Sequence, residues 1–150
     1  MDHSTREGPD GLPPGRGFCV AAGRGMALGA IGGEALATAT QTQGRLSVLV
    51  SHFPPGHHVP PHVHQRTDEC FYVLTGSYTI TCGPDTFHAT AGSVVFLPRG
   101  TPHSHTADEK VPAGAVIFSM PGGLERFEAG VGAGADPDLL GRYHDVTFLR

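Results

Sequence analysis

A chain of 150 residues is long enough to bury one hydrophobic core and suggests a single domain. Its formal net charge of -4 and its lack of any Lys/Arg cluster argue against a nucleic-acid partner. No stretch approaches the roughly 18 apolar residues of a membrane span, and the polar start lacks a signal-peptide pattern. We therefore expect a cytoplasmic protein that contacts neither nucleic acid nor membrane.

The first part of the chain gives weak structural signals. Residues 1–17 are rich in glycine, proline and charge and show no hydrophobic period, so we expect a disordered arm. Short strands are predicted from Phe18 to Val20 and from Met26 to Ile31, although glycine and alanine weaken the second prediction. Leu36–Thr40 alternates as a strand does and is expected to pair at one edge of a sheet.

The middle of the chain consists of short β-forming runs separated by turn residues. Arg45–Phe53 is apolar on both faces, and Ala113–Met120 is strongly β-forming. The strands predicted between them are Val59–His64, Glu69–Leu74, Tyr78–Cys82, Thr86–Thr90, Ser93–Leu97 and Thr101–Thr106. Short strands at regular spacing are typical of a sandwich or jelly-roll barrel. We therefore predict an all-β fold with its barrel in residues 18–121.

Four side chains within this region have the chemistry of metal ligands. His62 and His64 are two residues apart, so in an extended segment both point to the same face. Glu69 opens the next strand and offers an oxygen ligand, and His103 offers a third imidazole. Imidazole suits zinc, copper, iron and nickel, and a carboxylate adds manganese. The set predicts one divalent transition metal (Fe, Mn, Ni, Cu or Zn) without fixing its identity.

These residues carry a resemblance to the cupin superfamily. The first cupin motif is matched at every spacing by Gly56, His62, His64, Glu69 and Gly76, and the second by Gly92, Pro98, Gly100 and His103. The Asn that often closes the second motif is replaced by Ala107. The resemblance implies a cupin jelly-roll β-barrel (double-stranded β-helix) whose lumen holds the four ligands. Within the superfamily, the chain resembles small bacterial monocupins of the quercetin 2,3-dioxygenase-like and polyketide-pathway groups.

Residues 122–150 are predicted to form short helices and a strand after the barrel. Leu124–Ala129 has its apolar residues at helical spacing. Asp136 is placed as the N-cap of a second helix and Pro137 at its first position. Val146–Leu149 then ends the chain as a strand. This tail also resembles that of the quercetin 2,3-dioxygenase-like monocupins.

Two further groups of residues are candidates for substrate contact. His105 lies two residues beyond His103, so it is either a substrate-facing imidazole that acts in catalysis or a histidine at the rim of an ending strand. Phe71 and Val73 lie two and four residues after Glu69, so in a regular strand their side chains point to the same face as that of Glu69. Together with Phe53 they are candidate walls of an apolar substrate pocket, and simple core packing is the alternative. His57 and His58, in a proline-rich loop, are expected to be solvated.

The resemblance implies three functions. The first is a metal-dependent, dioxygenase-type enzyme that acts on an aromatic or polyphenolic small molecule, with Glu69 as both ligand and base. The second is a polyketide cyclase or isomerase that uses the metal as a Lewis acid, and the third is a small-molecule-binding protein without activity. A homodimer is also expected, because similar cupins pair their sheets and because strand edges such as Leu36–Thr40 need cover.

Overall fold

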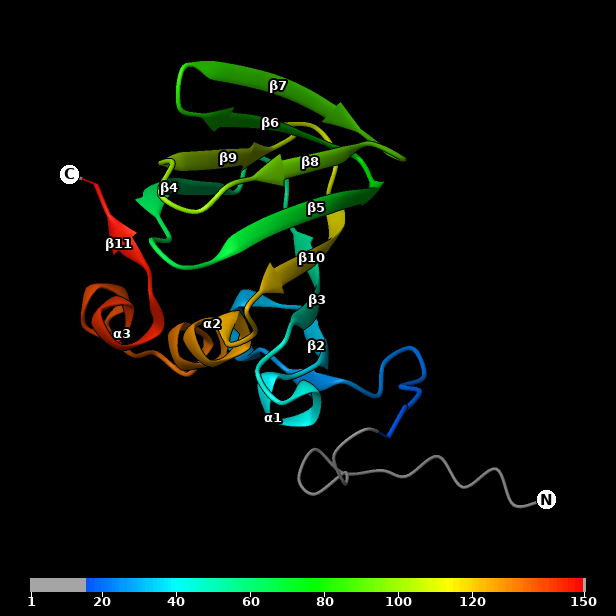
Figure 1. The fold of residues 1–150 in the computed structure, drawn as a ribbon. Helices are drawn as coiled ribbons and strands as arrows, with labels where there is room; N and C mark the ends of the chain where they lie inside the picture. Colours follow the sequence, from blue (N-terminus) through cyan, green and yellow to red (C-terminus); the bar gives the residue numbers. More distant parts are fainter. Residues whose placement is uncertain (1–15, 150) are drawn as a thin grey trace.

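The computed structural model describes residues 16–149 as two antiparallel β-sheets with helices beside them (Figure 1). One sheet has the strand order β1 (Met26–Ala27), β2 (Glu34–Ala37), β3 (Ser47–Phe53), β10 (Ala113–Met120), β5 (Asp68–Thr75) and β8 (Val94–Leu97). The other has the order β11 (Thr147–Phe148), β4 (His58–Val63), β9 (His103–Ala107), β6 (Ser77–Cys82) and β7 (Asp85–Thr90). The mostly β, jelly-roll architecture that the sequence predicts is confirmed.

The hydrophobic core lies between the two sheets. Phe71 and Val73 enter it from β5, Tyr78 and Ile80 from β6, and Leu49 from β3, and each is at most 1% exposed. Alternate residues of a strand point to opposite faces, so each strand gives every second side chain to this core. Burial of one such side chain contributes about 1.5–3 kcal/mol.

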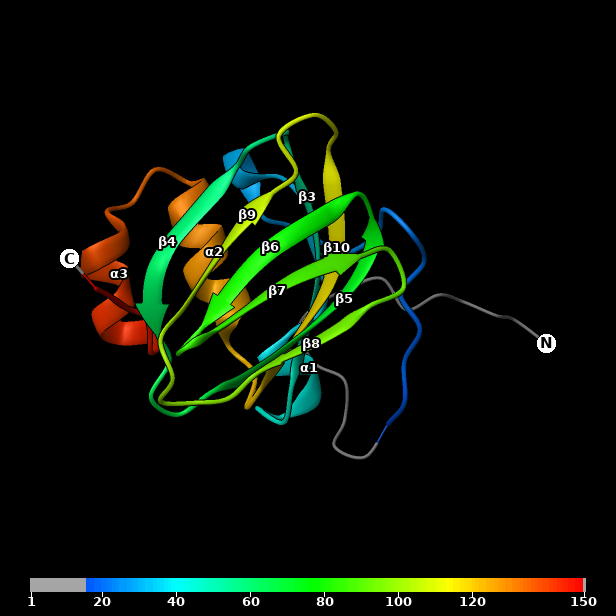
Figure 2. The same ribbon diagram turned by 90° about the horizontal axis from the view of Figure 1, so that it is seen from above.

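The helices lie on one side of the sheets. Their bounds are α1 (Ala39–Thr42), α2 (Leu124–Gly132) and α3 (Pro137–His144), with a 3-10 turn, η1, at Gly29–Ile31. Helices α2 and α3 pack against each other; α2 also packs against η1 and β3, and α3 against β11, which in turn pairs with β4 (Figure 2 shows α2 and α3 on the side of β4). Within residues 16–149, none of the helices is both long enough and apolar enough to cross a membrane.

Three predictions about the first part of the chain are wrong. Phe18–Val20 is not a strand, and Met26–Ile31 is a two-residue strand followed by η1. The predicted strand Leu36–Thr40 ends at Ala37, because Thr38 begins α1 with a capping box. Its hydroxyl accepts a hydrogen bond from the backbone of Gln41, whose side chain accepts one from the backbone of Thr38.

The edges of the larger sheet also differ from the prediction. Strand β2 lies between β1 and β3, so it is not the uncovered edge that was offered as a reason for dimerisation. Tyr72, on β5, faces away from the core and is 41% exposed. The predicted disordered arm at 1–17 falls mostly outside the described residues, and the segment from Arg16 to Val20 has no regular secondary structure.

The predictions for the end of the chain agree closely with the structure. Helix α2 continues three residues beyond the predicted Leu124–Ala129. The Asp136 carboxylate accepts a hydrogen bond from the backbone of Leu139, and Pro137 is the first residue of α3. The final strand pairs with β4, placing Phe148 opposite His62. The last strand therefore lies directly beside the strand that carries two candidate ligands.

Candidate metal centre

Two prolines shape the strand that carries His62. Along β4 and β9, Val59 pairs with His105 and His62 pairs with His103, so three steps on β4 oppose two steps on β9. The extra residue is a bulge at Pro60–Pro61, and proline suits it because proline cannot donate a ladder hydrogen bond. The bulge sets the register that puts His62 directly opposite His103.

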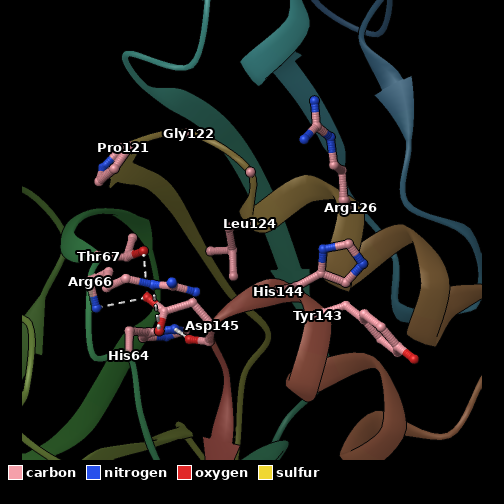
Figure 3. Close-up of a pocket in the computed structure, with 11 residues that line it drawn as sticks. His64, Arg66, Thr67, Pro121, Gly122, Leu124, Arg126, Tyr143, His144 and Asp145 are labelled. Carbon is pink, nitrogen blue, oxygen red and sulfur yellow. Dashed lines mark hydrogen bonds and ion pairs between the residues drawn. The ribbon is translucent and has the colours of Figure 1, made fainter.

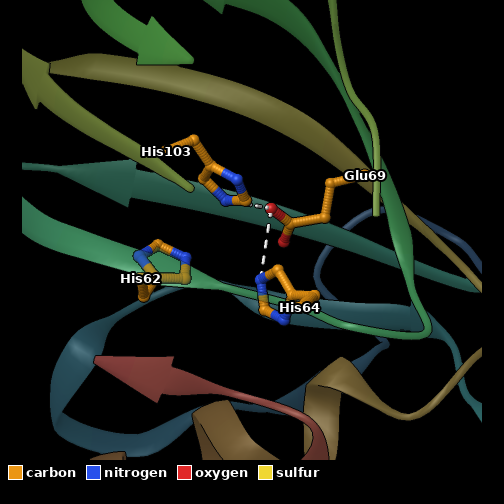
Figure 4. Close-up of side chains that lie close together, drawn as sticks. All are labelled: His62, His64, Glu69 and His103. Carbon is orange, nitrogen blue, oxygen red and sulfur yellow. Dashed lines mark ion pairs between the residues drawn. The ribbon is translucent and has the colours of Figure 1, made fainter. Parts of the chain in front are cut away.

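The structure brings the four predicted ligands together. His62, His64, Glu69 and His103 are each 3–6% exposed, and one ligand atom from each lies within 4.8 Å of the others (Figure 4). They come from β4 and the residue after it, from β5 and from β9. Oε2 of Glu69 lies 3.0 Å from Nε2 of His103 and 3.5 Å from Nε2 of His64. The cluster therefore has the residues, burial and spacing that could hold one metal ion.

Hydrogen bonds orient two of the imidazoles. Nδ1 of His62 donates to the carbonyl oxygen of Pro60, and Nδ1 of His64 donates to that of Asp145, each over 2.8 Å. With the proton on Nδ1, each Nε2 carries a lone pair, as a metal requires. Nε2 of His64 and Nε2 of His103 face Oε2 of Glu69 without the geometry of a hydrogen bond, and Nδ1 of His103 has no hydrogen-bond partner among the described residues. Buried nitrogens without partners are rare in proteins, and a metal ion would satisfy those at the centre.

The electrostatics of the cluster also fit a metal. Burial lowers the pKa of His62 from 6.5 to about 4, with His103 adding to the effect, so this imidazole is neutral at pH 7. Burial alone would raise the pKa of Glu69, but the interactions with His103 and His64 outweigh it and hold that pKa well below its usual range. Burial would lower the pKa of His64 too, but its contacts with Glu69 and Asp145 outweigh burial and raise that pKa, so a metal would displace a proton there. A neutral imidazole and an ionised carboxylate are the forms that bind metal.

A cavity of about 190 Å³ opens onto the cluster. Its aromatic wall contains Phe53, His57, Phe71 and His105. Phe53 and His57 stack in parallel with ring centroids 4.5 Å apart, and His105 lies 5.2 Å from Phe71 and 5.7 Å from Phe53. Helix α2 closes another side with Leu124, Phe127, Glu128 and Val131. The cavity is mainly apolar and meets the candidate ligands His62, His64 and Glu69.

The other predicted site residues are placed as follows. His105 is 6% exposed and lines the cavity, so it is not a histidine at the rim; burial lowers its pKa to about 3. Phe53 and Phe71 line the cavity, whereas Val73 is completely buried in the core and is not part of the lining. His57, expected to be solvated, is half-buried against Phe53.

Sequence reasoning missed two acidic residues near the centre. Glu128 lines the cavity from α2, and Asp145 follows α3. The carboxylate of Asp145 accepts hydrogen bonds from the backbone of Gln65 and Arg66 and from the hydroxyl of Thr67. A second cleft, of about 260 Å³, lies beside these contacts and also borders His64 (Figure 3). The helical spacing of the apolar residues around Glu128 predicts which face of the helix this residue shares. It does not predict that this face packs against the cavity.

Comparison with known families identifies the architecture. Residues 49–119 match the model of the cupin domain family. This part of the chain is therefore similar to a cupin domain. The matched segment begins in β3, ends in β10 and contains all four residues of the metal centre. Helices α2 and α3 and strand β11, and with them Glu128 and Asp145, lie outside the matched segment.

Several solved structures share this fold. KdgF from Halomonas sp. is 22% identical, with a TM-score of 0.55, over 61% of this chain and 79% of that one. A predicted oxalate decarboxylase from Thermotoga maritima is 20% identical, with a TM-score of 0.55, over 60% and 79%. The Cnp3 cupin domain of Schizosaccharomyces pombe is 19% identical, with a TM-score of 0.55, over 70% and 72%. No curated protein matches the chain. At these identities the likeness shows the fold alone.

Proposed function

We propose that this protein is a metal-dependent enzyme of the dioxygenase type that acts on a small aromatic or polyphenolic molecule. His62, His64, Glu69 and His103 would hold one divalent transition metal. The observation that carries the proposal is the aromatic cavity that opens directly onto this cluster. When bound, the metal would supply a Lewis acid, and a redox-active metal would also support oxygen chemistry.

The size and lining of the cavity narrow the substrate class. A volume of about 190 Å³ is below the roughly 300–1,000 Å³ of pockets for drug-sized ligands. It favours a compound with a single ring over a three-ring flavonol. Phe53, Phe71 and His105 offer ring faces and edges, which suit an aromatic ligand. The substrate that fits best is therefore a one-ring compound with an acidic oxygen.

In this proposal Glu69 would take a proton from such a substrate. It lies in the cavity lining and its pKa is lowered, so it is ionised at neutral pH. One of its oxygens lies between His64 and His103, so the carboxylate has the two roles of metal ligand and proton acceptor available to it. His105 lines the cavity as a neutral imidazole and would contact the bound ring.

A second candidate function is an isomerase or cyclase of a polyketide-like compound. The observation that favours it is Glu128, a second carboxyl in the same cavity. Proton transfer between two positions of a substrate needs an acid and a base, and two carboxyls in different environments can divide these roles. A binding protein without activity would use the metal centre and the cavity. Neither Glu69 nor Glu128 would then need to carry a proton.

Oxygen consumption separates these functions. The protein, reconstituted separately with Fe²⁺, Mn²⁺, Ni²⁺, Cu²⁺ or Zn²⁺, would be mixed with one-ring polyphenols under air and under nitrogen. The dioxygenase proposal predicts oxygen uptake that is stoichiometric with substrate loss and that requires a redox-active metal. Turnover that is equal under nitrogen, or equal with zinc, would contradict it and favour the isomerase. Binding without turnover of any compound would favour the binding protein.

A further inference from the structure

Helix α2 presents one carboxyl in an otherwise apolar stripe. Leu124, Phe127, Glu128 and Val131 recur at helical spacing, and all four line the cavity above the metal centre. Leucine, phenylalanine and valine at such positions are explained by packing. A carboxyl is not, because Glu128 is part-buried among these apolar side chains and loses hydration there without gaining a partner among the described residues. Glu128 therefore needs a separate account.

The other carboxyl of the same helix, that of Glu125, has a structural role. Glu125 is buried, and its two oxygens accept hydrogen bonds from the backbone of Ala39 and from the hydroxyl of Ser47. These bonds attach α2 to α1 and β3. Glu128 makes no hydrogen bond or ion pair with any described residue. Burial, with Glu69 adding to it, raises the pKa of Glu128 to about 7. The two carboxyls have different surroundings although they are three residues apart.

Glu128 is also separate from the metal ligands. The cluster of ligand atoms within 4.8 Å consists of His62, His64, Glu69 and His103. Glu128 lines the cavity that His62, His64 and Glu69 also line, but it comes from α2 and not from the barrel. A molecule bound at the centre through an oxygen atom would extend into the cavity, where Glu128 is the remaining acidic group of the lining.

We propose that Glu128 is a ligand-binding residue whose carboxyl hydrogen-bonds a hydroxyl or amino group on the part of the ligand remote from the metal centre. This inference rests on the proposed function and makes its substrate class more specific. The ligand is a one-ring compound with an acidic, chelating oxygen at one end and a hydrogen-bond donor at the other. The donor satisfies the carboxyl that the protein leaves unpaired.

Two one-ring chelators test the hydrogen bond between Glu128 and the ligand. Kojic acid and allomaltol bind metals through the same pair of oxygens, but kojic acid has a hydroxymethyl group where allomaltol has a methyl group. Their dissociation constants would be measured by calorimetry with the zinc-loaded protein and its variants. At pH 8, where a carboxyl with a pKa of about 7 is mostly ionised, a hydrogen bond to this charged group predicts that the wild type binds kojic acid about 10-fold or more tightly than allomaltol.

The Glu128→Leu variant should lose this preference and bind allomaltol with nearly wild-type affinity. Glu109→Leu, at an exposed turn, is the matched control and should keep the preference. Zinc content and thermal midpoint of each variant show that the fold and the centre are intact. Equal binding of both compounds by the wild type, or an unchanged preference in Glu128→Leu, would overturn the role of Glu128. Failure of the zinc-loaded protein to bind either compound would instead overturn the proposed function, and this inference with it.

Discussion

The main-chain oxygen of Asp145 accepts a hydrogen bond from Nδ1 of His64, 81 positions earlier in the chain, over 2.8 Å. The carboxylate of the same residue holds the loop that follows His64, through the backbone of Gln65 and Arg66 and the hydroxyl of Thr67. This loop connects His64 to the strand of Glu69. One residue of the C-terminal tail therefore fixes the orientation of one candidate ligand and the path between two of them.

Removing this carboxylate should weaken metal binding. Groups that orient a ligand typically change metal affinity by about 10- to 100-fold, and we expect Asp145→Ala to lower zinc affinity within that range. Asp145→Asn should retain more affinity, because an amide oxygen still accepts hydrogen bonds and Asn tolerates the φ of 58° at this position. The zinc affinities of the wild type and of both variants would be measured by competition with a chromophoric chelator.

The control for this prediction is Asp136→Ala. It removes the N-cap of the same helix, α3, by deleting the acceptor for Leu139, but it touches no candidate ligand. General loosening of the tail would affect both variants alike. A loss of zinc affinity in Asp136→Ala as large as that in Asp145→Ala would mean that Asp145 acts only through the stability of the tail.

The metal-free protein should lose stability in mild acid. The folded-state pKa values of His62 and His105 are about 4 and about 3, both below the ordinary 6.5, so between pH 6 and 5 the unfolded chain binds two protons that the folded chain does not. Glu128 acts in the opposite sense, because its pKa is raised from 4.5 to about 7 and it binds one proton in the folded chain only. The net difference of about one proton makes stability fall between pH 6 and 5 by about 1.4 kcal/mol per pH unit. Urea unfolding at pH 7.5, 6 and 5 measures this slope.

Replacing one of these histidines should make the slope shallower. His105→Phe preserves an aromatic ring among Phe53, Phe71 and Tyr78 but removes one titrating group. We expect stability to change little between pH 6 and 5, because the proton that His62 gains on unfolding is offset by the one that Glu128 loses. A slope equal to that of the wild type would show that His105 does not titrate in this range on unfolding.

Glu69→Gln should separate metal binding from proton transfer. The amide keeps one oxygen near His64 and His103, and three imidazoles remain, so much of the metal should be retained. An amide cannot accept the proton of a substrate, so most turnover of an active phenol should be lost. Retention of both metal and turnover would show that Glu69 is not the base and would direct attention to His105 and Glu128.

The outer face of the larger sheet is the surface on which we expect a second copy to pack. Tyr72 and Leu74 of β5 and Val94 and Phe96 of β8 are 41–63% exposed and adjacent in the sheet. Exposed apolar patches of this kind mark interaction sites. The wild type should sediment at twice its 15.7 kDa chain mass at micromolar concentration.

A charge on this face should separate the two copies. Phe96→Lys is expected to sediment as a single 15.7 kDa chain, because a lysine would be buried without a partner at the contact. Phe87→Lys, at a residue 41% exposed on β7 of the other sheet, should leave the dimer intact. A wild type that sediments as one chain would contradict the dimer.

The metal centre could be predicted because its information is local. His62 and His64 are set by strand alternation, and correlated spacings pointed to Glu69 and His103. The same locality explains the successful placement of Asp136 as a helix cap. Thr38 and Gln41 have the spacing of the capping box that they form, whereas the alternation of residues 36–40 favours a strand.

The missed residues depend on long-range packing. Glu128 lies at a helical position whose face is decided by where α2 meets the barrel, and Asp145 acts through contacts about 80 positions distant. His57 was expected in solvent because its loop is rich in proline, but it stacks on Phe53. No local pattern encodes these contacts.

Metal content is the measurement that tests the central claim most directly. The protein would be purified without added metal, saturated with zinc, desalted and analysed for elements, beside a variant that combines His62→Ala and His64→Ala. Circular dichroism would verify that the variant keeps its β structure. The account predicts one metal ion per wild-type chain and none held stoichiometrically by the variant. Full metal retention by the folded double variant, or no stoichiometric metal in the wild type, would contradict it.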